Sequence, residues 1–207
     1  MRVLIACEFS GVMRRAFRAR GHDAWSCDLL PAADCSEFHF QGDCRNVILR
    51  EHWDLLIAHP TCTYLCNSGV RWLYGGKGHK RDLDRWAEMQ LGALFFKWLL
   101  ERPECPRIAV ENPIMHVYAR DIIGRRPDQI VQPWWFGDEA FKATGWWLRG
   151  LPKLVPTNKL TPPKPGTKEH KRWSKVHRAS PSPTRWAERS ATYPGLAAAC
   201  AEQWGAA

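Results

Sequence analysis

The stretch WDLLIAHPTCTYLCNSG, residues 53–69, decides how this chain is interpreted. Its first part, Trp53–Ala58, is an apolar run with the length of a buried strand, and the loop that follows is rich in Pro, Thr, Asn and Gly. The loop presents a thiol, Cys62. A strand that ends at such a loop is a common way for an α/β enzyme to offer a nucleophile to a cleft, although many free cysteines are simply small buried residues. This stretch alone supports both interpretations.

A second strand favours the nucleophile. Residues 107–111 (RIAVE) form another apolar run, which ends in an acid, Glu111, and is followed by Asn112 and Pro113. Ligands of a parallel sheet lie across the carboxyl ends of its strands. The chain therefore offers a thiol and a carboxyl group where such a sheet binds its ligand.

Strand patterns and helix patterns alternate along much of the chain. The expected strands are residues 2–6, 24–27, 53–58, 107–111, 129–134 and 144–148, and the expected helices are residues 12–20 and 83–100. A poorly defined element closes at Gly42 and Asp43. The alternation predicts an α/β fold with a doubly wound, mostly parallel sheet, in which the last two strands form an antiparallel edge pair. Helix 83–100 is expected to turn the following residues toward the sheet: Leu83, Trp86, Leu91, Leu94 and Trp98.

Length and cysteine usage narrow the class of protein. The 207 residues, with 12 Trp, suffice for one domain with a sizeable core. The amino-terminal apolar run is too short for a signal peptide, and no run reaches the roughly eighteen apolar residues of a membrane span. The eight Cys show no paired spacing, so reduced thiols are expected. These features predict a soluble cytoplasmic protein without a membrane partner.

The net charge of +9 is concentrated in one segment, Leu151–Arg189, where ten Lys and Arg face two Glu. The segment is rich in Pro, Ser and Thr, so little regular structure is expected. Trp173 and Trp186 lie among the cations, and a basic strip with aromatic residues suits phosphates and unstacked bases. A solvated tail is the alternative. The candidate nucleic-acid contacts are Lys168, Lys171, Arg172, Trp173, Lys175 and Arg178.

Two acids near the amino terminus indicate an adenosine-containing cofactor. Asp28 follows the second expected strand and could accept hydrogen bonds from ribose hydroxyls, while Asp43 could accept from the exocyclic amine of adenine. The turn of Phe9, Ser10 and Gly11 leads into a helix amino terminus, near the charged end of such a cofactor. No GxGxxG occurs, which disfavours a dinucleotide. Each acid could also be a solvated helix cap.

The order of these segments resembles the catalytic domain of DNA cytosine-5 methyltransferases, most of all the short versions that phages and prophages encode. Four segments carry the resemblance: ACEFSG (6–11, with Asp28), HPTC (59–62), VENP (110–113) and FGDEAFKATGWWL (136–148). The stretch SATYPGLAAACAEQW, residues 190–204, resembles the helix that returns to complete the cofactor pocket. The specificity lies in the order and spacing of the segments, since each fragment alone is unremarkable.

The resemblance implies a Rossmann-like methyltransferase fold, S-adenosylmethionine as the cofactor and a bacterial or phage-infected cell as the location. It divides the chain into a catalytic core (1–150), a basic segment that contacts DNA (151–189) and a terminal helix (190–207). A large target-recognition domain is missing, which implies a short or lax sequence context. The implied cofactor contacts are Phe9, Ser10, Gly11, Asp28, Asp43, Pro60, Ser190 and Thr192.

The resemblance also implies the roles of four catalytic residues. Cys62 would add to carbon 6 of cytosine, because carbon 5 alone is too weak a nucleophile to take a methyl group. Glu111, kept ready for protonation in a closed apolar pocket, would donate to ring nitrogen 3, and Asn112 would orient its carboxyl group. Lys142 would supply one positive donor near the carbonyl of the base. The target cytosine must be flipped out or single-stranded.

Departures from the family pattern keep other functions open. Thr61 precedes Cys62 where the family has proline, and the arginine-rich strand is reduced to Lys142 and Thr144. Lysine cannot form the two parallel hydrogen bonds that arginine forms. A catalytically decayed DNA-binding protein, or a pyrimidine-modifying enzyme with another donor or substrate, therefore remains possible. Cys66 is a competing thiol, and its spacing from His59, Cys62 and His79 is too loose to predict a zinc site, so no metal is expected.

Overall fold

A computed structural model describes residues 1–75, 80–178, 182, 189–190 and 192–206. Seven strands of this part of the chain form one sheet with the order β3-β2-β1-β4-β5-β7-β6. The strands are β1 (Arg2–Ala6), β2 (Asp23–Asp28), β3 (His39–Gln41), β4 (Leu55–Ala58), β5 (Arg107–Pro113), β6 (Gln129–Val131) and β7 (Thr144–Arg149). β1 to β5 run parallel to one another, and β7 is antiparallel to both β5 and β6. The predicted α/β sheet with an antiparallel edge pair is confirmed.

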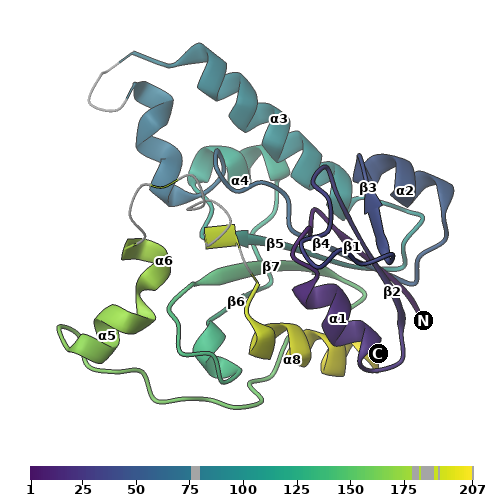
Figure 1. The fold of residues 1–207 in the computed structure, drawn as a ribbon. Coiled ribbons are helices and arrows are strands. Elements are labelled where there is room, and N and C mark those ends of the chain that lie inside the picture. The colour runs from purple at the N-terminus through teal and green to yellow at the C-terminus, as the bar shows by residue number, and fades with distance from the viewer. Residues whose placement is uncertain (76–79, 179–181, 183–188, 191, 207) are drawn as a thin grey trace.

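Helices cover both faces of the sheet, as Figure 1 shows. One face packs against α2 (Cys44–Arg50), α3 (Leu83–Leu100) and α4 (Val117–Ile123), through residues such as Ile48, Phe96 and Ala119. The other face packs against α1 (Val12–Arg18) and α8 (Pro194–Gly205), through residues such as Phe17 and Trp204. Because β1 and β4 are buried on both faces, their sequences are continuous apolar runs, which made them predictable.

The structure corrects several sequence predictions. Two helices of seven residues each, α2 and α4, were not expected. The expected strand 129–134 ends at Val131, because Pro133 cannot donate to a strand ladder and begins a 3-10 helix, η2 (Pro133–Trp135). The basic segment contains two short helices, α5 (Lys168–Trp173) and α6 (Lys175–Arg178), and another 3-10 helix, η1 (Asn67–Tyr74), follows the Cys62 loop.

The predicted inner face of α3 is confirmed for Trp86 and Trp98, which pack against the core, and wrong for the three leucines. Leu83, Leu91 and Leu94 are 75%, 62% and 54% exposed, whereas Met89 and Phe96 are fully buried. Both faces of this helix are apolar, so periodicity alone could not select the one that packs on the sheet. No helix of the described residues is long and apolar enough to cross a membrane.

Candidate functional site

The candidate site lies at the carboxyl edge of the central strands. β4 and β5 pair with Ala58 opposite Val110, so that His59 and Glu111 come next on the two strands. The backbone N–H of His59 donates to the carbonyl of Ala6, 2.9 Å away, which fixes the chain where it leaves the sheet. Order along the chain and strand register therefore bring this histidine and this acid together.

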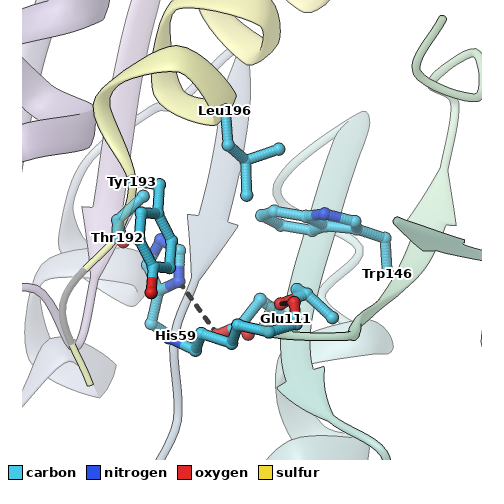
Figure 2. Close-up of a pocket in the computed structure, with 8 residues that line it drawn as sticks. His59, Glu111, Trp146, Thr192, Tyr193 and Leu196 are labelled. Carbon is cyan, nitrogen blue, oxygen red and sulfur yellow. Dashed lines mark hydrogen bonds and ion pairs between the residues drawn. The ribbon is translucent and has the colours of Figure 1, made fainter. Parts of the chain in front are cut away.

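His59 and Glu111 form a buried polar pair. The Nδ1 atom of His59 lies 3.3 Å from Oε2 of Glu111, and the two side chains are 12% and 13% exposed. Figure 2 shows this contact in a small cavity of about 10 Å³, the room of one water molecule, walled by Trp146, Tyr193 and Leu196. Lys142, Thr144 and Thr192 complete its lining.

Each partner of this pair has a second polar atom that is free. Among the described residues, neither Oε1 of Glu111 nor Nε2 of His59 has a hydrogen-bond partner, although both atoms are buried. A buried polar atom without a partner costs about 1–3 kcal/mol, so its presence in a native structure needs an explanation. A ligand that contacts both atoms is one explanation.

The direction of the Glu111 pKa differs from the sequence prediction. Burial raises this pKa, as predicted, but the hydrogen bond from His59 and the charges of Lys142 and His59 outweigh burial and lower it. The carboxyl group is therefore ionised in the resting site. A carboxyl group in this state has no proton of its own to donate, and His59 is in contact with it.

Cys62 lies in a tight turn after β4. Its carbonyl accepts the N–H groups of Leu65 and Cys66 at 3.0 and 3.1 Å, and its side chain remains partly exposed. A hydrogen bond with Cys66, burial, and the charges of Cys66 and Glu111 raise the pKa of the Cys62 thiol, while Lys142 opposes them. The thiol, the carboxyl group and the ammonium group are thus close enough to influence one another.

Cys66 carries the negative charge of the thiol pair. The hydrogen bond with Cys62 lowers the pKa of Cys66 to about 5 against the effect of burial, with help from Ser68 and the amides of Ser68 and Gly69. The hydroxyl of Ser68 lies 3.0 Å from the Cys66 sulfur. Cys66 lies at the amino terminus of η1, a position that lowers cysteine pKa values. Cys62 therefore rests as a thiol beside a thiolate.

Asn112 does not orient Glu111, so this prediction is wrong. Successive side chains of a strand point to opposite faces of the sheet, and Glu111 and Asn112 are neighbours in β5. The Asn112 side chain is fully buried, and its amide has no partner within the part of the chain that the structure describes. His59 takes the place next to the carboxyl group.

Lys142 and the terminal segment close the cavity. The Nζ atom of Lys142 lies 6.0 Å from the centre of the Tyr193 ring, and its backbone N–H donates to Gln132 at 3.2 Å. Thr192, predicted as a cofactor contact, lies in the same lining as His59 and Glu111. Of the other two residues predicted to contact the cofactor, Pro60 is buried two residues after β4, and Ser190 is exposed. The cavity of about 10 Å³ is smaller than a pyrimidine ring, so a base could enter only if Tyr193 moved aside.

The predicted cofactor residues lie at the other end of the same edge. Asp28 ends β2, and its Oδ1 accepts the N–H of Leu30 at 3.0 Å. Leu29 and Leu30, directly after it, are 73% and 40% exposed. Apolar side chains beside a carboxylate suit a purine ring joined to a ribose, so these residues fit the adenosine part of S-adenosylmethionine.

Asp43 and the Phe9–Gly11 turn have structural roles at the starts of two helices. Asp43 caps α2 by accepting the N–H of Arg45 at 2.9 Å, and the hydrogen bond from the Arg45 side chain lowers the pKa of its carboxyl group. Phe9, Ser10 and Gly11 lead into α1, and Gly11 has a positive φ of 69°. The amides of α1 bind Glu8, whose carboxylate accepts from Met13 at 2.7 Å. These amides of α1 are therefore already occupied by Glu8.

A buried arginine lies behind this turn. Arg14, only 1% exposed, donates to Ser26 at 2.6 Å and to both oxygens of Asp34 at 2.6 and 2.5 Å. Burial alone would raise the pKa of Asp34, but the hydrogen bonds from Arg14 and Arg15 lower it to about 2. The loop after β2 is thus fixed to α1.

The basic segment matches the prediction only in part. The structure exposes Lys168, Lys171, Arg172, Lys175 and Arg178. Arg172 also pairs with Glu139 at 2.8 Å and Glu169 at 3.5 Å. Trp173, expected to stack on bases, is 3% exposed and packs 5.4 Å from Phe141, because α5 buries it against the core. Trp186 and His79 lie outside the described residues.

The sequence analysis did not foresee the roles of two cavity residues, His59 and Tyr193, or of two buried structural residues, Glu8 and Arg14. His59 had a usable signal, since it directly follows β4 just as Glu111 ends the apolar run of β5. Tyr193 lies within the stretch that the resemblance covers, but only the fold brings it to Lys142. Glu8 and Arg14 had no such signal, because a charged residue in an amphipathic helix pattern is normally solvated.

The strand order and the antiparallel β7 define a Rossmann-like fold of the type found in S-adenosylmethionine-dependent methyltransferases. No family model and no curated protein matches the chain. Among solved structures, it is similar in fold to a mutant of DNMT2 from Spodoptera frugiperda, with 13% sequence identity and a TM-score of 0.44. The match covers 80% of this chain, and the chain spans 56% of that protein.

Proposed function

We propose that this protein methylates carbon 5 of cytosine in DNA, with S-adenosylmethionine as the donor and Cys62 as the nucleophile. One arrangement carries the proposal. Cys62 lies close enough to Glu111 and Lys142 for the first to raise and the second to lower its pKa, and a buried oxygen of Glu111 has no partner among the described residues. A thiol next to a carboxyl group and a cation is the set that covalent activation of a pyrimidine needs.

The first step is addition of the Cys62 sulfur to carbon 6 of the ring. The thiol has to lose its proton, and the neighbouring Cys66 thiolate is an acceptor already in contact with it. The new carbon–sulfur bond pushes an electron pair into the ring, toward nitrogen 3. Lys142, on the rim of the same cavity, offsets the negative charge that develops there.

Glu111 and His59 then supply the proton that nitrogen 3 takes up. Oε1 of Glu111 faces no protein donor in the described structure, while Oε2 contacts Nδ1 of His59 at 3.3 Å. When both ring nitrogens of His59 carry a proton, the one on Nδ1 can pass to this carboxyl group, which leaves His59 as a neutral imidazole and makes Glu111 the acid that the ring requires. This relay explains how a glutamate with a lowered pKa can still act as a donor.

The residues proposed to hold the cofactor follow β1 and β2 at the carboxyl edge of the sheet. Asp28 would hold the ribose hydroxyls, and Leu29 with Leu30 would cover the adenine ring. When bound, S-adenosylmethionine supplies an electrophilic methyl group for carbon 5. Water then takes the carbon 5 proton, the electron pair of that bond restores the double bond between carbons 5 and 6, and the sulfur–carbon 6 bond breaks to return Cys62 as a thiolate.

The exposed cations of α5 and α6 support DNA as the substrate. Lys168, Lys171, Lys175 and Arg178 offer charges to phosphates, which position a duplex without selecting its sequence. We therefore expect a recognition context of only a few bases and an affinity that falls steeply with salt. Bisulfite sequencing of DNA from expressing cells would reveal the context, and a long fixed site would contradict this part.

Two assays on the full chain test the reaction. Tritium should pass from labelled S-adenosylmethionine to DNA, and DNA with 5-fluorocytosine should form a covalent adduct, because fluorine cannot leave as a proton does. Cys62→Ser should abolish both results, whereas Cys35→Ser, at an exposed cysteine, should keep both. An adduct that survives Cys62→Ser and disappears in Cys66→Ser would assign the nucleophile to Cys66.

A DNA-binding protein without catalysis is the second candidate. The raised pKa of Cys62 favours it, because a protonated thiol is a poor nucleophile. In this case DNA would bind with a steep salt dependence, while neither tritium transfer nor the fluorocytosine adduct would be detected.

A further inference from the structure

Cys62 and Cys66 are two thiols on one turn of the chain. The backbone N–H of Cys66 donates to the carbonyl of Cys62 at 3.1 Å, which closes the turn. Residues four apart in a helical turn have their Cβ atoms about 5–6 Å from each other. A hydrogen bond also joins the two side chains. The two sulfurs are therefore neighbours in the resting fold.

A disulfide between these residues needs only a small further approach. Its Cβ atoms lie about 3.5–4.5 Å apart, so those of the turn have to approach by about 1–2 Å. Cys66 is held by a bridge to Met115, and Asn67 next to it donates to the carbonyl of Ile114 at 2.9 Å. Cys62 lies between β4 and η1, outside both elements. The movement therefore falls on the Cys62 side of the turn.

The two sulfurs rest in the unequal states that oxidation by a peroxide requires. The hydrogen bond with Cys62 lowers the pKa of Cys66 to about 5, and the same bond raises the pKa of Cys62. Thiolates attack peroxides, whereas thiols do so poorly. Cys66 is 8% exposed and Cys62 is partly exposed, so solvent reaches the pair. Cys66 is thus the sulfur to be oxidised, and Cys62 lies where it can react next.

A second pair of cysteines is in contact but lacks these features. The Sγ atom of Cys7 lies 4.0 Å from that of Cys44. Cys7 directly follows β1 and Cys44 begins α2, so a disulfide would have to shift a strand end or a helix. The hydrogen bond with Cys44 and burial raise the pKa of Cys7 well above its ordinary value. This pair is a comparison that the protein itself provides.

We infer that Cys62 and Cys66 form a reversible disulfide when hydrogen peroxide reaches the protein. The Cys66 sulfur attacks one peroxide oxygen, the O–O bond breaks, and Cys66 becomes a sulfenic acid. The other oxygen leaves as hydroxide and takes a proton from solvent. The Cys62 sulfur then attacks the Cys66 sulfur. The S–S bond forms, the S–O bond breaks, and the departing hydroxide takes the proton of the Cys62 thiol as water.

The disulfide ends the oxidation at a stage that a dithiol reverses. A sulfenic acid without a neighbouring thiol is oxidised further to a sulfinic acid, which thiol reductants do not repair. The bond forms whether or not the protein methylates DNA, so this inference stands apart from the proposed function. Where the proposed function holds, the bond occupies the Cys62 sulfur that the reaction uses. Methyl transfer should then stop until the disulfide is reduced.

Peptide mass spectrometry of the full chain tests the disulfide. Trypsin releases residues 51–71 as one peptide, which holds Cys62 and Cys66 and no other cysteine. After treatment with equimolar hydrogen peroxide, this peptide should resist iodoacetamide and be lighter than the reduced peptide by two hydrogen atoms. Dithiothreitol before alkylation should restore both thiols. Peptides 3–14 and 21–45, which hold Cys7 and Cys44, should stay unlinked.

Two variants assign the roles of the two sulfurs. Cys62→Ser keeps a hydroxyl donor beside Cys66 but removes the thiol that reacts second, so the Cys66 sulfenic acid should persist and be trapped by dimedone. Cys35→Ser removes an exposed thiol and should give the wild-type yield of disulfide. Alkylation of both cysteines of peptide 51–71 after peroxide would overturn the inference. A bond between Cys7 and Cys44 that forms first would also overturn it.

An activity assay on the same samples separates this inference from the proposed function. The loss of tritium transfer to DNA should match the fraction of disulfide, and dithiothreitol should reverse both. A chain that forms the disulfide but never labels DNA would support the inference and refute methylation. A chain that labels DNA but forms no disulfide would do the opposite.

Discussion

Two buried polar clusters lie along the carboxyl edge of the sheet, and they differ in whether their groups have partners. In the first, which we call the Arg14 cluster, Glu8 accepts from the start of α1, and Arg14 binds Ser26 and both oxygens of Asp34. In the second, the Glu111 cluster, Oε1 of Glu111 and Nε2 of His59 have no partner in the described ranges.

The difference separates a structural role from a functional one. Hydrogen bonds to a charged group each contribute about 1.5–3 kcal/mol, so the Arg14 cluster stabilises the fold, even though Nε of Arg14 itself lacks a partner among the described residues. The Glu111 cluster costs stability instead. Such a cost persists where a ligand uses the free atoms, which is why we place the reaction there.

Glu111→Gln should have the largest effect on activity. The amide cannot pass a proton to nitrogen 3, so methyl transfer should fall by about 10²–10⁴-fold. The thermal unfolding midpoint should fall only slightly, because the contacts with His59 and Lys142 that favour the charge outweigh the cost of burying it by a small margin. Rates of methyl transfer and thermal melts of one preparation measure both effects. Glu139→Gln, on the surface, is the matched control. Normal turnover of Glu111→Gln would refute the assignment.

Arg14→Met should mainly lower the free energy of unfolding, whereas Glu111→Gln should mainly lower the rate of methyl transfer. Met fills similar space but leaves Ser26 and Asp34 without this donor, at a cost of about 2–3 kcal/mol. For a domain of this size, the melting midpoint should fall by about 5–10 °C. Arg20→Met, which removes an exposed pair with Glu202, should cost less than about 1 kcal/mol. Equal losses in both variants would mean that the Arg14 cluster adds nothing.

Much of the fold could be predicted because burial leaves a clear pattern. β1 and β4 are buried on both faces and read as continuous apolar runs, and β5 does so up to Glu111. Short helices such as α2 and α4 have two turns each, too few for a periodic pattern to stand out.

The site was predictable where residues directly follow strands. Cys62 and Glu111 come together because β4 and β5 are neighbours, and the sequence indicated both strand ends. The prediction that Asn112 orients Glu111 was wrong because adjacent residues of a strand face opposite sides of the sheet. The exchange of a proton between Cys62 and Cys66 depends on the turn and on the amides at the start of η1, which no spacing rule encodes.

Acid should weaken the Arg14 cluster through Asp34. Its pKa is lowered to about 2 in the folded protein, so its stabilising effect is complete above the ordinary value of about 4 and is lost as the pH falls toward 2. After solvent screening, the loss should be about 1–2 kcal/mol. Urea midpoints at pH 5 and pH 2.5 should differ more for the wild type than for Asp34→Asn. Parallel behaviour of the two proteins would show that Asp34 is not held by the arginines.

Cys66→Ala should produce the smallest change, confined to the Glu111 side. Loss of the neighbouring thiolate should lower the pKa of Cys62 toward the ordinary value of about 8.5, so more of it is thiolate at pH 7.5. Iodoacetamide should then alkylate Cys62 at least several-fold faster, as followed by mass spectrometry. Exposed Cys35 in the same sample is the internal control. Slower alkylation would mean that Cys66 activates Cys62 rather than keeping it protonated, and the resting charge would belong to Cys62.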